Sequence, residues 1–218
     1  MEYENTTIGF LESETSAKFF ADSDFALRQG HHIQHFGSDA KLWDYINDHY
    51  EQLCIYYEHL FAVYLRRESN ERDVYFYLEF PENGSGKFTR DRHKLLDERQ
   101  LIIGILLLNL YKERYFESKA IKWSTIENII EEGEQKELWL KVLYGEVKRN
   151  YTPNEKDEMK RRMERTLYEF EKMGWINWID HDKLHFEILP SIDRIAKLYA
   201  NEINNIELMT EYINEQLS

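Results

Sequence analysis

The sequence predicts a mainly α-helical chain with small β-hairpins, an α+β fold made of two similar halves. Each half begins with helical patterns and ends with two short runs rich in aromatic and β-branched residues, the pattern of a helix followed by a hairpin. The 218 residues include only 3 prolines and 9 glycines, whereas 15 tyrosines, 12 phenylalanines and 5 tryptophans can fill cores. This composition argues against disorder and allows one large domain or two small ones.

The clearest helix is expected between Thr152 and Met173. Thr152 is a suitable N-cap, Pro153 suits the first helical position, and Glu155 completes a capping box. Gly174 suits the left-handed residue that ends a helix. This helix therefore has clear start and stop signals.

A hairpin is expected directly after this helix. Its strands are predicted at residues 175–179 and 184–188, on either side of the turn Asp180-His181-Asp182-Lys183. A helix that runs straight into a hairpin is the second half of a winged helix-turn-helix. A nucleic acid or a protein is therefore the expected partner, and an enzyme is not expected.

The first half of the chain repeats this order. A short helix is expected at residues 23–29, and a longer one from Asp39 to about His59. Two β-rich runs follow at residues 60–65 and 74–80, separated by a charged turn. The sequence therefore predicts tandem winged-helix domains.

The densest cluster of breaker residues, Pro-Glu-Asn-Gly-Ser-Gly, occupies positions 81–86. Such a cluster is typical of a domain boundary. We therefore expect an N-terminal winged-helix domain over residues 1–82, a linker over 83–94, a second winged-helix domain over 95–190 and a C-terminal helical segment over 191–218.

Another helix, expected from Asp97 to about Tyr115, has a centre that is apolar on all sides. A helix of that kind is buried all round, either in a domain core or in a dimer interface. The candidate core or dimer residues are Leu101, Ile102, Ile105, Leu106 and Leu108.

Charge and cysteine usage limit the function further. The formal net charge is −13, whereas a domain that binds DNA by itself usually carries a basic face. Local basic patches can still touch DNA if a partner holds it in place, and an acidic surface suits a basic partner. The single cysteine, Cys54, fits a reducing compartment. With no recognisable signal peptide or membrane-spanning run, a soluble cytoplasmic protein is expected.

One basic stripe lies on the helix that begins near Thr152. At about 100° per residue, its core-facing sector is apolar and contains Met159, Met163, Leu167 and Phe170. The opposite sector, about 60° wide, is free of acids and contains Arg161, Arg165, Tyr168 and Lys172. On an acidic protein this stripe indicates contact with DNA phosphates, with Tyr168 packing on the backbone or a partner. The alternative is a chance arrangement on a solvated face.

A second basic segment spans residues 87–94, with four basic residues to one acid. Its candidate DNA contacts are Lys87, Arg90, Arg92 and Lys94. The alternative is a solvated linker.

Other features favour a protein partner. The turn at residues 180–183 is acidic, whereas a wing that enters a DNA groove is usually basic. The helix expected at residues 39–59 is also acidic, since it carries Asp44, Asp48, Glu51 and Glu58. The winged-helix domains are therefore expected to bind protein in the main.

The sequence contains no recognised catalytic or metal-binding pattern. It has no Gly-rich phosphate loop, nucleophile elbow or zinc-protease helix. The clustered histidines match no zinc spacing and no cysteine pair accompanies them; they are His31, His32, His35, His181 and His185. We expect no enzymatic activity, no cofactor and no metal.

Four collinear segments resemble the MukE-type subunits of bacterial condensins. Residues 25–33 resemble the family's N-terminal stretch "ALR-S-GRHI", and residues 75–78 its first wing strand. Residues 96–111 resemble its long apolar helix, and residues 166–188 its second recognition helix and wing, with His-Asp at the tip. The resemblance covers roughly residues 19–199 in order, and the chain is closer to the MksE branch.

This resemblance implies a tandem winged-helix protein that dimerises and binds a kleisin of the MukF or MksF type. The kleisin in turn joins an SMC ATPase of the MukB or MksB type, to which the ATP chemistry belongs. We therefore expect a non-enzymatic, nucleoid-associated subunit of a condensin complex that supports DNA entrapment, chromosome condensation and chromosome partition in the cell cycle. The alternatives are a stand-alone winged-helix transcription regulator and a subunit of a related anti-plasmid defence complex.

Overall fold

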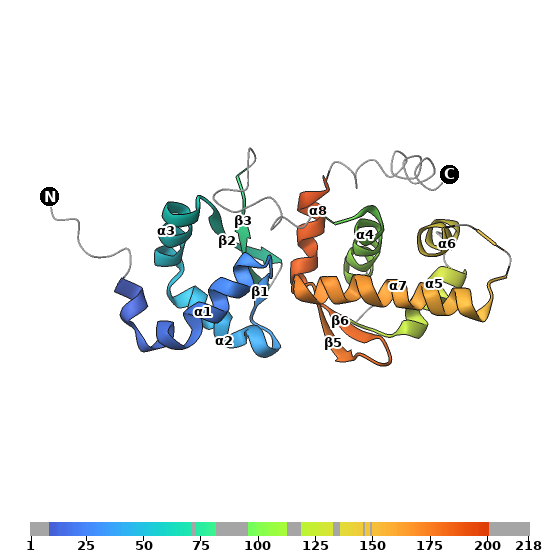
Figure 1. Ribbon diagram of the computed structural model, residues 1–218, viewed down its shortest axis with the longest axis horizontal. Helices are drawn as coiled ribbons and strands as arrows, with labels where there is room; N and C mark the ends of the chain where they lie inside the picture. The colour runs from blue at the N-terminus through green and yellow to red at the C-terminus, as the bar shows by residue number, and fades with distance from the viewer. Residues whose placement is uncertain are drawn as a thin grey trace. The chain divides into compact units, whose positions relative to one another are not determined.

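The computed structural model (Figure 1) describes residues 9–70, 73–81, 96–112, 119–132, 136–145, 147–148 and 150–200. The chain divides into two compact units. The N-terminal unit comprises Met1–Leu95 with Lys172–Gly174, and the C-terminal unit comprises Leu96–Glu171 with Trp175–Ser218. The expected linker, residues 83–94, lies outside the described residues, and the expected segment 191–218 is described only as far as residue 200. The fold is mainly helical with small antiparallel sheets, which confirms the α+β class.

The N-terminal unit places its helices before its hairpin. Its elements in order are η1 (Gly9–Glu12), α1 (Glu14–Arg28), β1 (Ile33–Gln34), η2 (Gly37–Asp39), α2 (Ala40–Asp48), α3 (Tyr50–Phe61), β2 (Tyr64–Asn70) and β3 (Asp73–Glu79). Helix α1 is longer than the helix predicted at residues 23–29. It begins early because the Ser13 hydroxyl caps it, accepting a hydrogen bond from the Ser16 N–H at 3.0 Å.

The single helix predicted over residues 39–59 is wrong, because the chain breaks at His49 into α2 and α3. His49 has non-helical angles, φ −111° and ψ 18°. Ile46 of α2 and Leu53 of α3 are both buried, so both helices pack into the same core. Ala62 then ends α3 in the left-handed conformation, with φ 54°, so β2 begins later than the predicted run at Leu60.

The sheet of the N-terminal unit is antiparallel and has the order β1-β3-β2. The central strand β3 pairs Phe76 with Ile33 of β1 and with Arg67 of β2. Phe76 and Ile33 are fully buried among the side chains of α2 and α3. The edge of this core holds Cys54, and burial raises the pKa of its thiol, as expected for a small core residue.

The C-terminal unit repeats the strand order. Its elements are α4 (Glu98–Lys112), β4 (Ala120–Ile121), α5 (Trp123–Glu132), α6 (Lys136–Tyr144), α7 (Pro153–Lys172), β5 (Ile176–Asp180), β6 (His185–Ile188), η4 (Pro190–Asp193) and α8 (Arg194–Leu198). The sheet is antiparallel with the order β4-β6-β5. The hairpin β5–β6 confirms the pair of strands predicted after α7, whereas the short strand β4 was not predicted.

Helix α4 supplies much of the core of the C-terminal unit. Three of the five candidate core or dimer residues are buried within the single chain: Ile102, Leu106 and Leu108. Leu101 and Ile105 are partly exposed in the single chain, so burial of that side in a dimer interface stays a prediction. The buried side of α4 packs against α6, η4 and α8.

In the described part of the chain, no helix combines the length and apolar character that a membrane span requires.

Candidate nucleic-acid interface

Helix α7, the long orange helix in Figure 1, begins with a complete capping box. The Thr152 hydroxyl accepts a hydrogen bond from the Glu155 N–H at 3.3 Å, and the Thr152 N–H donates to the Glu155 carboxylate at 2.8 Å. Pro153 occupies the first helical position. These contacts confirm the predicted start, and Gly174, with φ +71°, confirms the predicted end.

The Glu155 carboxylate has a second role, because Lys148 also reaches it. The Lys148 Nζ lies 2.7 Å from Glu155 Oε1. The hydrogen bond from Lys148, followed by those from Thr152, lowers the pKa of Glu155 from 4.5 to about 2. The carboxylate is therefore ionised throughout the physiological pH range.

The inward face of α7 is the apolar sector predicted from the sequence. Its buried residues are Met159, Met163, Thr166, Leu167 and Phe170. The one polar member, Thr166, donates its hydroxyl hydrogen bond to the Arg162 carbonyl one turn earlier, at 3.2 Å. This face fixes the helix against its unit and so determines which side chains point outward.

The outward face carries the four predicted contact residues of α7. The side chains of Arg161 and Arg165 are 68% and 70% exposed. Tyr168 is 47% exposed, and Lys172 is exposed as well. All four lie on the side of α7 opposite its buried face, where a phosphate backbone can reach them.

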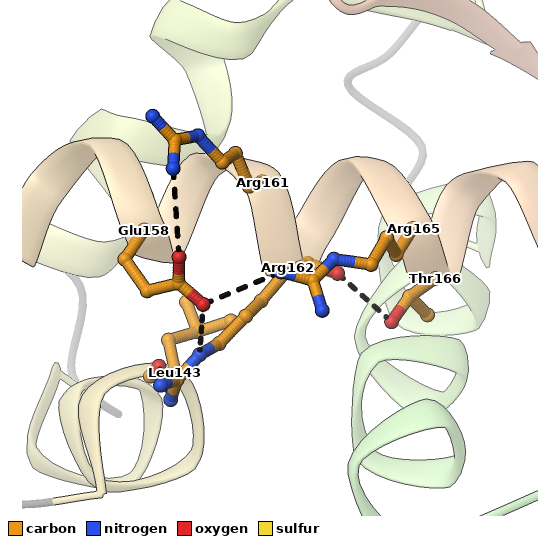
Figure 2. A network of polar contacts seen from close by, with 6 residues as sticks. All are labelled: Leu143, Glu158, Arg161, Arg162, Arg165 and Thr166. Atoms are coloured by element: carbon orange, nitrogen blue, oxygen red, sulfur yellow. Dashed lines mark hydrogen bonds and ion pairs between the residues drawn. The ribbon is translucent and has the colours of Figure 1, made fainter.

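The prediction that this stripe is free of acids is wrong. Glu158 lies about 20° outside the sector on a helical projection, but its side chain reaches into it. Figure 2 shows three arginines converging on this one carboxylate: Arg161, Arg162 and Arg165. Neither Glu158 nor Arg162 was predicted from the sequence as part of the site. The three arginines follow Glu158 by three, four and seven residues, a helical spacing that indicates such pairs.

The three arginines are held in different ways. Arg162 is the anchored one, since its Nε lies 3.2 Å from Glu158 Oε1 and its Nη1 donates to the Leu143 carbonyl at 3.3 Å. Arg165 Nη2 lies 3.3 Å from the same carboxylate oxygen, and Arg161 Nη1 lies 3.9 Å from the other. The hydrogen bond from Arg162 and the charges of all three arginines lower the pKa of Glu158, so it is ionised at neutral pH.

The hairpin turn that follows α7 is partly neutralised within itself. Lys183 Nζ lies 2.6 Å from Asp180 Oδ2, and the Lys183 N–H donates to Oδ1 of the same residue. The hydrogen bond with Lys183 lowers the pKa of Asp180. The one lysine of this turn, Lys183, is paired with Asp180, so the tip of the hairpin is not basic. This agrees with its acidic sequence.

The other predicted features are placed as follows. Lys87, Arg90, Arg92 and Lys94 lie outside the described residues, so their role stays a prediction. The acids assigned to one helix are divided by the break at His49: Asp44 and Asp48 belong to α2, and Glu51 and Glu58 to α3. Helix α3 keeps two exposed acids, Glu51 and Glu58, and has no lysine or arginine. It is therefore still a poor match for DNA.

A small cavity lies beside the N-terminal half of α7, next to the stacked rings of Tyr144 and Tyr151. Its volume is about 70 Å³, room for a few water molecules and far less than a small-molecule site of several hundred Å³ needs. Among the described residues no three histidine, cysteine or acidic side chains gather to hold a metal ion. The candidate interface is therefore a charged surface.

Comparison with protein families gives the class of protein to which this chain belongs. The model of the family "Condensin complex protein MksE" matches residues 18–199, most of the chain. No curated protein matches the chain. The chain belongs to the MksE family of condensin complex proteins, as its four collinear segments indicated.

Proposed function

We propose that this chain is a non-enzymatic subunit of a bacterial MukBEF/MksBEF-like SMC condensin complex. In this proposal it binds the kleisin, and through the kleisin an SMC ATPase, and it supports DNA entrapment, chromosome condensation and segregation. It works in the cytoplasm on the nucleoid, as a homodimer. The observation that carries the proposal is the family match over residues 18–199.

We infer further that each unit is a winged-helix domain. Both units place helices before an antiparallel hairpin, and in both the first strand pairs with the last, as β1-β3-β2 and β4-β6-β5. In this assignment α3 and α7 are the helices that precede the wings. The acidic α3 suits a protein partner, and α7 carries the basic stripe.

The DNA contact is proposed for the outward face of α7 within the assembled complex. Arg161, Arg165, Tyr168 and Lys172 are exposed there on one side of a rigid helix. Contacts of this kind read no base sequence and supply the non-specific part of DNA affinity. With a net charge of −13, the chain needs a partner to hold DNA against this face.

Co-purification tests the proposed subunit role. A tagged full-length chain, expressed from its own genome, should retain a kleisin and a large coiled-coil ATPase, and the two should be identified by mass spectrometry. Sedimentation of the purified chain at micromolar concentration should give twice the monomer mass of 26.6 kDa. Recovery of neither partner would remove the condensin proposal, and a clean monomer would remove the homodimer.

A stand-alone transcription regulator is the second candidate, favoured by the exposed arginines on the helix before a hairpin. It predicts that the isolated chain prefers one DNA sequence strongly over competitor DNA. The condensin proposal predicts no such preference. Selection of bound sequences from a random pool separates the two. A subunit of an anti-plasmid complex would share the partners of the first candidate and differ in the phenotype of its deletion.

A further inference from the structure

Three arginines share one carboxylate on the outward face of α7. Oxygen Oε1 of Glu158 receives Arg162 and Arg165, and Oε2 faces Arg161. A carboxylate and a phosphate both offer pairs of anionic oxygens that suit guanidinium groups. A backbone phosphate oxygen can thus replace the Glu158 carboxylate as the partner of an exposed arginine.

The exposed pairs are the ones that can exchange partners. Arg162 is half-buried and keeps a second acceptor in the Leu143 carbonyl. Arg161 and Arg165 are largely exposed and approach Glu158 at 3.9 and 3.3 Å, so each is a weak, solvent-screened pair. Both can turn toward a phosphate while Arg162 holds Glu158 in place.

We propose that Glu158 is a built-in competitor for DNA phosphate, which sets how tightly the arginines of α7 bind the DNA backbone. This inference rests on the proposed DNA contact of α7. Glu158 is ionised at neutral pH, as an ordinary glutamate is, and the arginines lower its pKa further, so its charge competes with phosphate at neutral pH. Its negative charge also repels a phosphate that docks on Arg161 or Arg165. Glu158 therefore keeps the contact weak and reversible.

The variant Glu158→Gln removes the charge and preserves the shape. The Gln amide oxygen can still accept from Arg162, and the Leu143 carbonyl still holds that guanidinium, so the helix should fold unchanged. One additional neutralised phosphate adds about 0.9 to the slope of log affinity against log salt. At about 0.1 M salt this corresponds to a gain in DNA affinity of roughly three- to tenfold.

Asp157→Asn is the matched control. Asp157 is the exposed neighbour of Glu158 on the same turn of α7, and in the described part of the chain it is not one of the acids that pair with these arginines. Both variants change the net charge from −13 to −12, since each removes one acid. If Glu158 competes directly for the arginines, only Glu158→Gln raises the DNA affinity. If DNA responds only to the net charge, both variants raise it equally.

The experiment measures binding of the complex assembled from the full-length chain, its kleisin and its SMC ATPase to a fluorescent DNA duplex by anisotropy, from 50 mM salt upward. Glu158→Gln should bind more tightly with a steeper salt slope, and Asp157→Asn should change affinity less than twofold. Equal gains in both variants, or weaker binding of Glu158→Gln, would overturn the role of Glu158. Circular dichroism and thermal unfolding confirm that each variant is folded.

A double variant, Arg161→Gln with Arg165→Gln, separates this inference from the proposed DNA contact. If it binds DNA as the wild type does, or if no variant binds even at 50 mM salt, the DNA contact of α7 itself is removed. If it loses affinity, the DNA contact stands, and adding Glu158→Gln to it should then bring no gain. If Glu158→Gln still raises the DNA affinity of the double variant, Glu158 does not compete for Arg161 and Arg165. The proposed DNA contact would remain.

Discussion

At the residue scale, Glu155 shows how one carboxylate can serve a helix end and an ion pair together. It accepts hydrogen bonds from Thr152 and lies 2.7 Å from Lys148 Nζ. These contacts favour the ionised form, so the pKa of Glu155 falls from 4.5 to about 2. A carboxyl whose pKa is depressed on folding stabilises the fold above its unfolded pKa. The contribution is therefore complete above about pH 4.5 and is lost as the pH falls toward 2.

This gives a pH prediction for Glu155→Gln. Glutamine keeps the capping geometry but has no charge to titrate. The wild type should melt at a higher temperature than the variant by a constant margin above pH 5, and that margin should shrink between about pH 4.5 and 2. Thermal unfolding across this range measures it, and NMR titration of the Glu155 carboxyl carbon gives the midpoint directly. A midpoint near 4.5 would show that the two partners do not hold the carboxylate in solution.

At the element scale, α4 and α8 approach closely at Gly104. A Cβ built on Gly104 would lie 2.6 Å from Ile195 Cδ1 and 3.4 Å from Phe170 Cζ. Ile195 and Phe170 are fully buried, so a larger side chain forces the packing apart. This glycine is in the helix for close packing, despite its cost of about 1 kcal/mol in helix propensity relative to alanine.

Gly104→Val should therefore lower the free energy of unfolding by roughly 1–3 kcal/mol, the cost of overpacking a core. Urea denaturation followed by circular dichroism measures the loss. Asn109→Val is the control on the same helix, because Asn109 is exposed and asparagine and valine have similar helix propensities. Equal stability of Gly104→Val and the wild type would mean that Ile195 swings aside without cost.

Local signals explain which elements could be predicted from the sequence. Both ends of α7 were predicted because Thr152, Glu155 and Gly174 act through contacts a few residues away. The break at His49 was missed because no proline or glycine marks it and the helical apolar spacing continues across it from Ile46 to Leu53. The two-residue strand β4 was missed for a similar reason, since only its pairing with β6 defines it.

The candidate site was predicted in part. A helical projection places Arg161 and Arg165 outward correctly, because it follows the backbone period. It represents each residue by a single direction and ignores side-chain length. Glu158, just outside the sector, was excluded for that reason although its carboxylate reaches all three arginines. On α7, acids three, four and seven residues from a basic side chain therefore belong to the same charged face.

At the scale of the whole molecule, a net charge of −13 coexists with a local basic face on α7. At physiological ionic strength charges farther apart than about 8 Å are largely screened, so the face acts on whatever lies directly against it. The bulk charge instead disfavours loose, non-specific association with DNA. In the proposed complex, the chain would then bind DNA mainly where a partner protein brings the DNA against α7.

Charge reversal on α7 should separate the two proposed binding activities. Arg161→Glu with Arg165→Glu changes the net charge from −13 to −17, because each substitution removes one positive and adds one negative charge. DNA binding by the complex assembled with kleisin and SMC ATPase should weaken by roughly tenfold or more and become less dependent on salt, since two phosphate contacts are lost. Kleisin co-purification should not change.

Lys18→Glu with Lys41→Glu produces the same net charge on exposed residues of the N-terminal unit and should leave DNA binding nearly intact. Equal losses in both double variants would mean that DNA senses only the total charge, and loss of the kleisin would place the protein interface on α7 instead.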